Sequence, residues 1–193
     1  MPLASAGIQA ACDARWLWPR TAAGSLSGDL SKNFMLTIES VVRSSGLAGV
    51  DALWPELEKA VSEADDRELQ CTAAEMVGGI VRASHSLTPA DQEQLHARLG
   101  PLVSSTLASL SPNSVGAWAE MLRYVSANRD PRRLNWLTGV VLGLSDSIGD
   151  DSGGGALALV SAPAECPDAV FAFRCAPLQQ RLFAFPETDM CWQ

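Results

Sequence analysis

Apolar residues recur at intervals of three and four through residues 31–147, and this periodicity is the feature that most constrains the fold. Such spacing places apolar side chains on one face of an α-helix, whereas a half-buried strand alternates apolar and polar residues. The region divides into about six such stretches joined by short polar connectors, with no alternating pattern. We therefore expect an all-α protein.

Residues at the ends of these stretches predict where the helices begin and end. Thr88 followed by Pro89, and Asp130 followed by Pro131, each predict a helix start, because the first residue of each pair can cap a helix and proline suits the first helical position. Gly46 predicts a helix end. The expected helices cover residues 32–45, 50–64, 66–84, 89–110, a stretch from about 114, and a stretch from 131 to 144.

Proline and glycine at three places inside these stretches bear on how the helices run and pack. Pro55 predicts that its helix either starts near that residue or kinks there, and the pair Gly100-Pro101 predicts a kink or a break. Gly78 and Gly79 would each cost an isolated helix about 1 kcal/mol. Their presence favours close approach by a neighbouring helix, since neither spacing of a phosphate-binding glycine loop is present.

Tryptophan and leucine in the helices are the expected packing residues. Trp54, Trp118 and Trp136 lie inside predicted helices, and Leu134 and Leu137 lie on the apolar stripe of the last one. A base-stacking platform would need basic neighbours, whereas the formal net charge is −8. That charge argues against direct binding of nucleic acid or an anionic membrane surface. Packing between helices is the simpler interpretation.

The sequence offers no converging set of catalytic or metal-binding residues. We expect His85 at a helix end, His96 exposed on a helix, Cys71 as a small buried residue and Glu75 facing water. The acidic run 62–68 lacks the glycine and alternating ligands of a calcium loop. HExxH, CxxC and GxSxG are all missing. The sequence therefore predicts a protein without catalytic residues, cofactor or bound metal.

Three segments differ in texture. Residues 1–30 read as an irregular or disordered N-terminal segment, residues 31–147 as helical repeats, and residues 148–193 as a low-order tail containing Gly and Pro. The five scattered cysteines favour a reducing compartment. Helical pairs recurring about every 40 residues are typical of HEAT or armadillo repeats, so we expect an α-solenoid segment. A compact helical bundle is the alternative.

The middle segment also resembles a known family. "RELQCTAAEMVGGIVRASHSLT", "LGPLVSSTL" and "VGAWAEMLRYVSANRDPRRLNWL" are similar to the C-terminal portion of the large HEAT-repeat proteasome activators, the proteasome activator complex subunit 4 family. The resemblance covers about residues 31–145 and is strongest from residue 67 onward. We expect the chain to be a fragment of such a protein, with residues 148–193 outside the family's coding sequence.

The resemblance implies a structural role. Members of the family are very large α-solenoids that form a dome over the outer ring of the 20S proteasome and promote gate opening without ATP. It also implies a nuclear and cytoplasmic location, a link to DNA repair, and contact with acetylated histones in the full-length proteins. No functional residue is carried over, because the chain ends in "TDMCWQ", without the family's aromatic C-terminal tail. The alternative is an independent helical-repeat adaptor that binds a protein partner.

Overall fold

The computed structural model describes residues 30–127 and 134–146, together with residues 158–159 and 161–162. Apart from short turns these residues are helical, and no strand occurs among them. The expected all-α, HEAT-like fold is confirmed. The elements in chain order are α2 (Lys32–Ser45), α3 (Leu47–Ser62), α4 (Arg67–Ala83), the 3-10 turn η1 (Ser84–Ser86), α5 (Pro89–Ser109), α6 (Val115–Ser126) and α7 (Asn135–Asp146).

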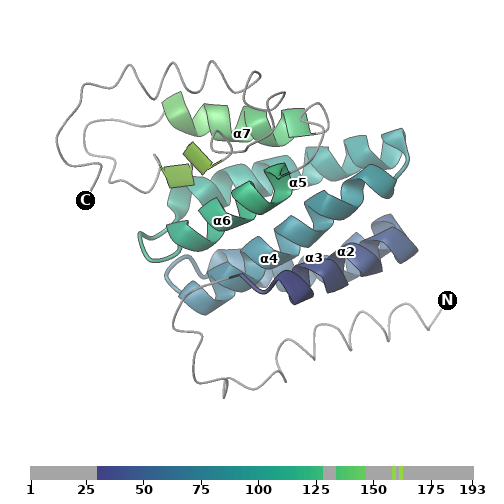
Figure 1. The fold of residues 1–193 in the computed structure, drawn as a ribbon, viewed down its shortest axis with the longest axis horizontal. Helices are drawn as coiled ribbons and strands as arrows, with labels where there is room; N and C mark the ends of the chain where they lie inside the picture. Colours follow the sequence, from purple (N-terminus) through teal and green to yellow (C-terminus); the bar gives the residue numbers. More distant parts are fainter. Residues whose placement is uncertain (1–29, 128–133, 147–157, 160, 163–193) are drawn as a thin grey trace.

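The helices stack in two rows. In one row α4 lies between α2 and α6, and in the other α5 lies between α3 and α7 (Figure 1). The stack follows the sequence, from α2 and α3 at one end to α7 at the other. This arrangement of successive helical pairs, each packed on its neighbours, is that of an α-solenoid segment.

Side-chain pairs fix the direction of the first row. From α2 to α4, contacts join Met35 with Gly78, Ile38 with Gly79, and Glu39 with Arg82. The paired residues advance in the same direction along both helices, so α2 and α4 are parallel. The contacts from α4 to α6 also advance together, because Gln70 meets Trp118 near the start of both helices and Arg82 meets Tyr124 near their ends.

Side-chain caps start three of the helices. Ser31 accepts a hydrogen bond from Phe34 N at the start of α2, and Asp66 accepts from Glu68 N and Leu69 N at the start of α4. Thr88 accepts from Asp91 N at 3.2 Å and caps α5, with Pro89 in its first turn. The predicted cap Asp130 lies outside the described residues.

Both internal prolines lie within continuous helices. α3 begins at Leu47 and runs through Pro55, and α5 runs from Pro89 to Ser109 through Pro101. The predicted break at Gly100-Pro101 and the predicted start near Pro55 are therefore wrong. Packing of α5 between α3 and α7 outweighs the local cost of a missing donor at Pro101.

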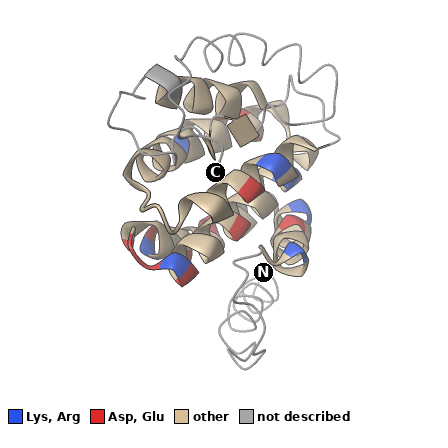
Figure 2. Ribbon diagram, turned by 60° about the vertical axis from the view of Figure 1, so that its left-hand side comes forward, with Lys and Arg blue, Asp and Glu red and all other residues tan. Residues whose placement is uncertain are grey.

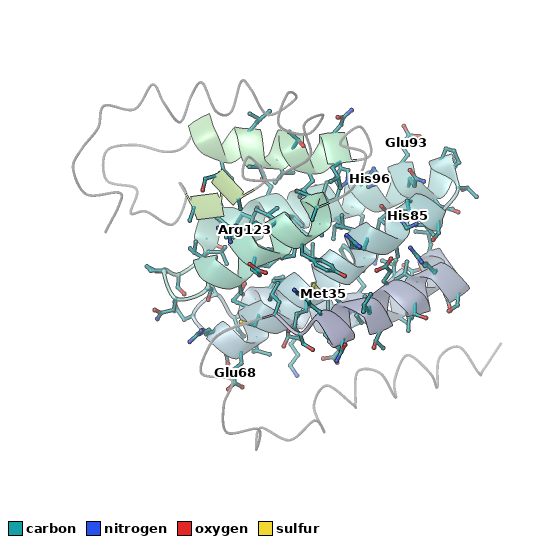
Figure 3. The ribbon with its side chains drawn as sticks, in the orientation of Figure 1. Met35, Glu68, His85, Glu93, His96 and Arg123 are labelled. Carbon is teal, nitrogen blue, oxygen red and sulfur yellow. The ribbon has the colours of Figure 1, made fainter. Side chains whose placement is uncertain are left out.

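Gly79 is the point of closest approach between α2 and α4. A Cβ atom at this position would lie 2.6 Å from Ile38 Cβ and 2.7 Å from the Met35 carbonyl oxygen. At Gly78, a Cβ would lie 2.9 Å from Met35 Sδ and 3.2 Å from Met121 Cγ. Figure 3 shows Met35 at this crossing. The expected close approach of a neighbouring helix is confirmed, and it involves α6 as well as α2.

The core is centred on α4, which is covered on almost every side. All residues from Ala73 to Val81 are buried, among them the Glu75 carboxylate, which is 1% exposed. The expectation that Glu75 faces water is therefore wrong, because α4 is flanked by α2, α3 and α6 rather than lying at the edge. Glu75 Oε1 instead accepts a hydrogen bond from Ser31 N at 2.6 Å, at the start of α2.

Candidate functional site

The polar contacts between helices are the most organised chemistry of the described residues. Within those residues no group of three His, Cys, Asp or Glu side chains could hold a metal ion. Each helix found there is also too short or too polar to span a bilayer. We therefore examined the buried polar groups that join one helix to the next.

Gln70 is the first of these groups and has no exposed surface. Its amide nitrogen lies 3.2 Å from the carbonyl oxygens of Ala60 and Glu63, and donates to the carbonyls at the C-terminal end of α3. Its Oε1 accepts from Trp118 Nε1 at 3.0 Å. Trp118 is likewise fully buried. One amide thus satisfies the end of α3 and the indole of α6 from a position on α4.

A second group links the C-terminal halves of α2, α4 and α6. Arg43 Nη2 lies 2.7 Å from Glu39 Oε1, and Glu39 Oε2 lies 3.9 Å from Arg82 Nε. Arg82 Nη1 donates to the Tyr124 carbonyl at 3.3 Å, and its guanidinium lies 4.6 Å from the centre of the Tyr124 ring. Glu39 is 5% exposed, so this is an ion pair within the stack rather than on its surface.

His85 joins the same group through both ring nitrogens. Its Nε2 lies 3.0 Å from Arg43 Nη2, and its Nδ1 contacts the Arg82 carbonyl oxygen. Arginine can only donate, so Nε2 must accept and Nδ1 must carry the proton. The geometry therefore selects the neutral Nδ1-protonated tautomer. The expectation of a helix-end residue agrees with its place in η1.

Each parallel helix of the first row carries an arginine in its last turn. These are Arg43 in α2, Arg82 in α4 and Arg123 in α6. They recur about every 40 residues, the period typical of HEAT repeats. A cation in the last turn is also favoured by the helix dipole. The side chain at the middle position, Arg82, reaches both neighbouring helices, as the solenoid arrangement requires.

His96 and Trp136 form the contact between α5 and α7. Their rings stack with centroids 5.0 Å apart and planes 20° apart. Gly100, one turn after His96, leaves room for the indole, since a Cβ there would lie 3.9 Å from Trp136 Cε3. Burial lowers the pKa of His96 below its ordinary value. The expectation of an exposed His96 is wrong, because α7 covers this part of α5.

Trp54 covers the contact between α3 and α5. The Arg98 guanidinium lies 3.9 Å from the centre of the Trp54 ring and also pairs with Asp51. Trp54 Nε1 donates to Glu58 Oε1 at 2.7 Å. Arg98 therefore bridges the two helices by a cation–π contact and an ion pair, both at the rim of the core.

The remaining predicted residues lie within the packed core or next to it. Leu134 and Leu137 are buried, Trp54 and Trp118 are buried, and Trp136 is half-buried. Cys71 is half-buried beside the core. None of these residues lies beside a second group with which it could carry out acid–base or nucleophilic chemistry. Their arrangement is that of packing residues.

Sequence reasoning missed Gln70 and Glu39, although a signal for both was present. Gln70 precedes Ala73 by three residues and so lies on the apolar stripe of α4. Glu39 lies four residues after Met35 and three before Val42, on the stripe of α2. A polar residue at an apolar position predicts a buried hydrogen bond or ion pair. Its partner, however, lies in a helix distant in sequence.

Charges on the surface do not form a basic face in the view of Figure 2, where blue and red segments are interspersed along the helices. The turn between α3 and α4 gathers the exposed acidic residues Glu63, Asp65, Asp66 and Glu68. These features match a net charge of −8 rather than a phosphate-binding surface.

Comparisons with known proteins point to one family. A family model described as "Proteasome activator complex subunit 4-like, HEAT repeat-like" matches residues 30–152. "Proteasome activator complex subunit 4" of Bos taurus is 28% identical over 104 residues, which are 54% of this chain and 6% of the relative. The protein of the same name in Xenopus laevis is 31% identical over 88 residues, 46% of this chain and 5% of the relative. "Proteasome activator complex subunit 4A" of Danio rerio is 29% identical over 85 residues, 44% of this chain and 5% of the relative.

The matched region coincides with the helical stack. The family model begins at residue 30, directly before α2, and ends at residue 152, shortly after α7. The chain matches only about a twentieth of the length of these curated relatives. Since the family model covers more than half of the chain and all six helices, the chain belongs to the proteasome activator complex subunit 4-like family of HEAT-repeat proteins.

Proposed function

We propose that the chain is a structural segment of an ATP-independent activator that caps the 20S proteasome and promotes gate opening and substrate entry. The observation that carries the proposal is the coincidence of the family match, residues 30–152, with an uninterrupted stack of helical pairs. The relatives that share this stack are named proteasome activator complex subunit 4. We propose the same association for this chain.

The internal contacts support a mechanical rather than a chemical role. In this role, Gln70 and Arg82 each tie α4 to both neighbouring helices of the stack, so that the angle between successive helical pairs is held fixed. A solenoid transmits the position of one end to the other only if these angles are fixed. A rigid segment of this kind is suited to supporting a dome over a ring-shaped particle.

The test is co-sedimentation of the purified chain with 20S proteasomes, combined with hydrolysis of a fluorogenic peptide in the absence of ATP. We expect part of the chain to move with the particles through a glycerol gradient, and peptide hydrolysis to rise. The Gly79→Leu variant should lose both effects, because its side chain cannot fit between α4 and α2.

Gly116→Ala is the matched control, because a Cβ at this helical position meets nothing within 4 Å. This variant should behave as the unmodified chain does. The proposal is wrong if the unmodified chain, shown to be helical by circular dichroism, sediments apart from the particles and leaves peptide hydrolysis unchanged.

An independent helical-repeat adaptor is the second candidate. It is favoured by the small amount of uncovered apolar surface, since Leu36 is the one large apolar side chain among the described residues that is clearly exposed, at 51%. An adaptor should fold alone as a monomer and ignore 20S particles. Sedimentation velocity of the chain with and without 20S particles distinguishes the two candidates.

Two expectations from the resemblance stay predictions. These are the nuclear and cytoplasmic location with its link to DNA repair, and contact of the full-length proteins with acetylated histones. A histone-peptide array probed with the chain, with acetylated and unmodified peptides side by side, would test the second.

A further inference from the structure

A short helical stretch beyond the family match is packed into the core. Leu159 is 1% exposed and Ala162 is fully buried, although the match ends at residue 152. The Ser161 hydroxyl donates to the Ala158 carbonyl at 3.2 Å, as in a helical turn. Residues three apart on a helix share one side. Leu159 and Ala162 therefore present a single small apolar face to the molecule.

This face lies at the α7 end of the stack. Both residues belong to the same hydrophobic cluster as Leu134, Leu137 and Val141 of the α7 region. In Figure 1 the yellow-green stretch lies next to α7, at the end of the stack farthest from α2. The last helix of a solenoid has no following repeat to cover its apolar side, so stable solenoids need a capping element there.

We propose that residues 158–162 are a built-in end cap, in which Leu159 and Ala162 cover the apolar edge that a following helical pair or a second copy of the chain would otherwise occupy. The proposal is independent of any association with the proteasome. It assigns a packing role to a stretch that lies within the segment expected to be a low-order tail.

Chain connectivity favours this occupant over a second copy. Residues 147–157 join α7 to the stretch, and a linker of that length can span about 36 Å. This reach is enough to return along α7, which at 12 residues is about 18 Å long. A tethered segment competes at an effective concentration on the order of millimolar. A second copy at micromolar concentration would be displaced.

The test compares the full chain with its Leu159→Asp variant by hydrogen–deuterium exchange and sedimentation velocity. We expect exchange to become faster in peptides of α7 while peptides of α2 and α4 keep their protection. We also expect the average mass to rise with concentration, because an uncovered apolar edge associates with another. Ser161→Ala, a change in the same turn at a half-buried position, should leave both measurements unchanged.

Several results would overturn the proposal. One is equal exchange in α7 for the unmodified chain and the Leu159→Asp variant. Another is an unmodified chain that is dimeric and becomes monomeric in the variant, since the edge would then be covered by a second copy. If Leu159→Asp loses its helical signal altogether, Leu159→Ala decides. It should lower the melting temperature by about 5–15 °C and speed exchange in α7 first, and no effect there would contradict the cap.

Discussion

Gln70 shows at the scale of a single residue how one side chain can hold two helices. Its amide is fully buried and satisfies the end of α3 as well as the indole of Trp118. An apolar side chain of the same length would leave the indole N–H without an acceptor in the core. Such an unpaired group costs about 1–3 kcal/mol.

The first prediction follows from these bonds. Gln70→Met should lower the free energy of unfolding by about 1–3 kcal/mol, because shape is conserved while the hydrogen bonds are lost. Urea unfolding followed by circular dichroism measures the change. Gln94→Met, at an exposed position of α5, is the matched control and should change the free energy by less than about 0.5 kcal/mol. Equal values for the two variants would show that the Gln70 bonds contribute nothing net.

His96 gives a second prediction at this scale, on pH. Burial against Trp136 lowers its pKa from the ordinary value of 6.5, so the unfolded chain binds a proton more readily than the folded one. Stability from this residue is therefore fully present above pH 6.5 and decreases as the pH falls below that value. His96→Gln should remove this part of the pH dependence.

Urea unfolding of both proteins between pH 5 and pH 8 tests the effect of His96, where these limits are about 1.5 units either side of its ordinary pKa. The difference in unfolding free energy between the unmodified chain and His96→Gln should shrink or reverse toward the acidic end. A difference that stays constant over the whole range would contradict the prediction, and so would one that grows as the pH falls.

At the scale of the element, helix position was predictable and helix environment was not. The stripe of α2 and the cap Thr88 are local features, and local sequence contains them. Whether Pro101 breaks α5 depends on α3 and α7, and whether Glu75 meets water depends on what lies on the far side of α4. Such facts depend on residues distant in sequence, so spacing within one helix could not predict them.

The α2–α4 crossing gives the prediction at this scale. Gly79→Ala should destabilise the chain by about 1–3 kcal/mol, because its methyl group would overlap Ile38 and the Met35 carbonyl oxygen. Gly116→Ala in α6 meets no neighbour, so it should stabilise by about 0.4–1 kcal/mol through the unfolded state. Thermal melts of both variants measure the two effects. Stabilisation by both would mean that the two helices are not in close contact at Gly79.

At the scale of the whole molecule, the polar and glycine contacts describe one design. Parallel helices approach at small residues, and each is tied to the next through a side chain that reaches both ways, as Arg82 does between α2 and α6. The family match over residues 30–152 places this design within the HEAT-repeat proteasome activators. The relatives extend it over a length about twenty times greater, of which this chain is one stretch.

The central claim is that α4 lies in the middle of a packed helical stack. Hydrogen–deuterium exchange of the full chain, read helix by helix, tests it most directly. Peptides covering Arg67–Ala83 should exchange more slowly than those of every other helix, because residues Ala73 to Val81 are all buried. If those peptides exchange as fast as the peptides of α7, or at the rate of an unfolded chain, α4 is not the centre of the stack.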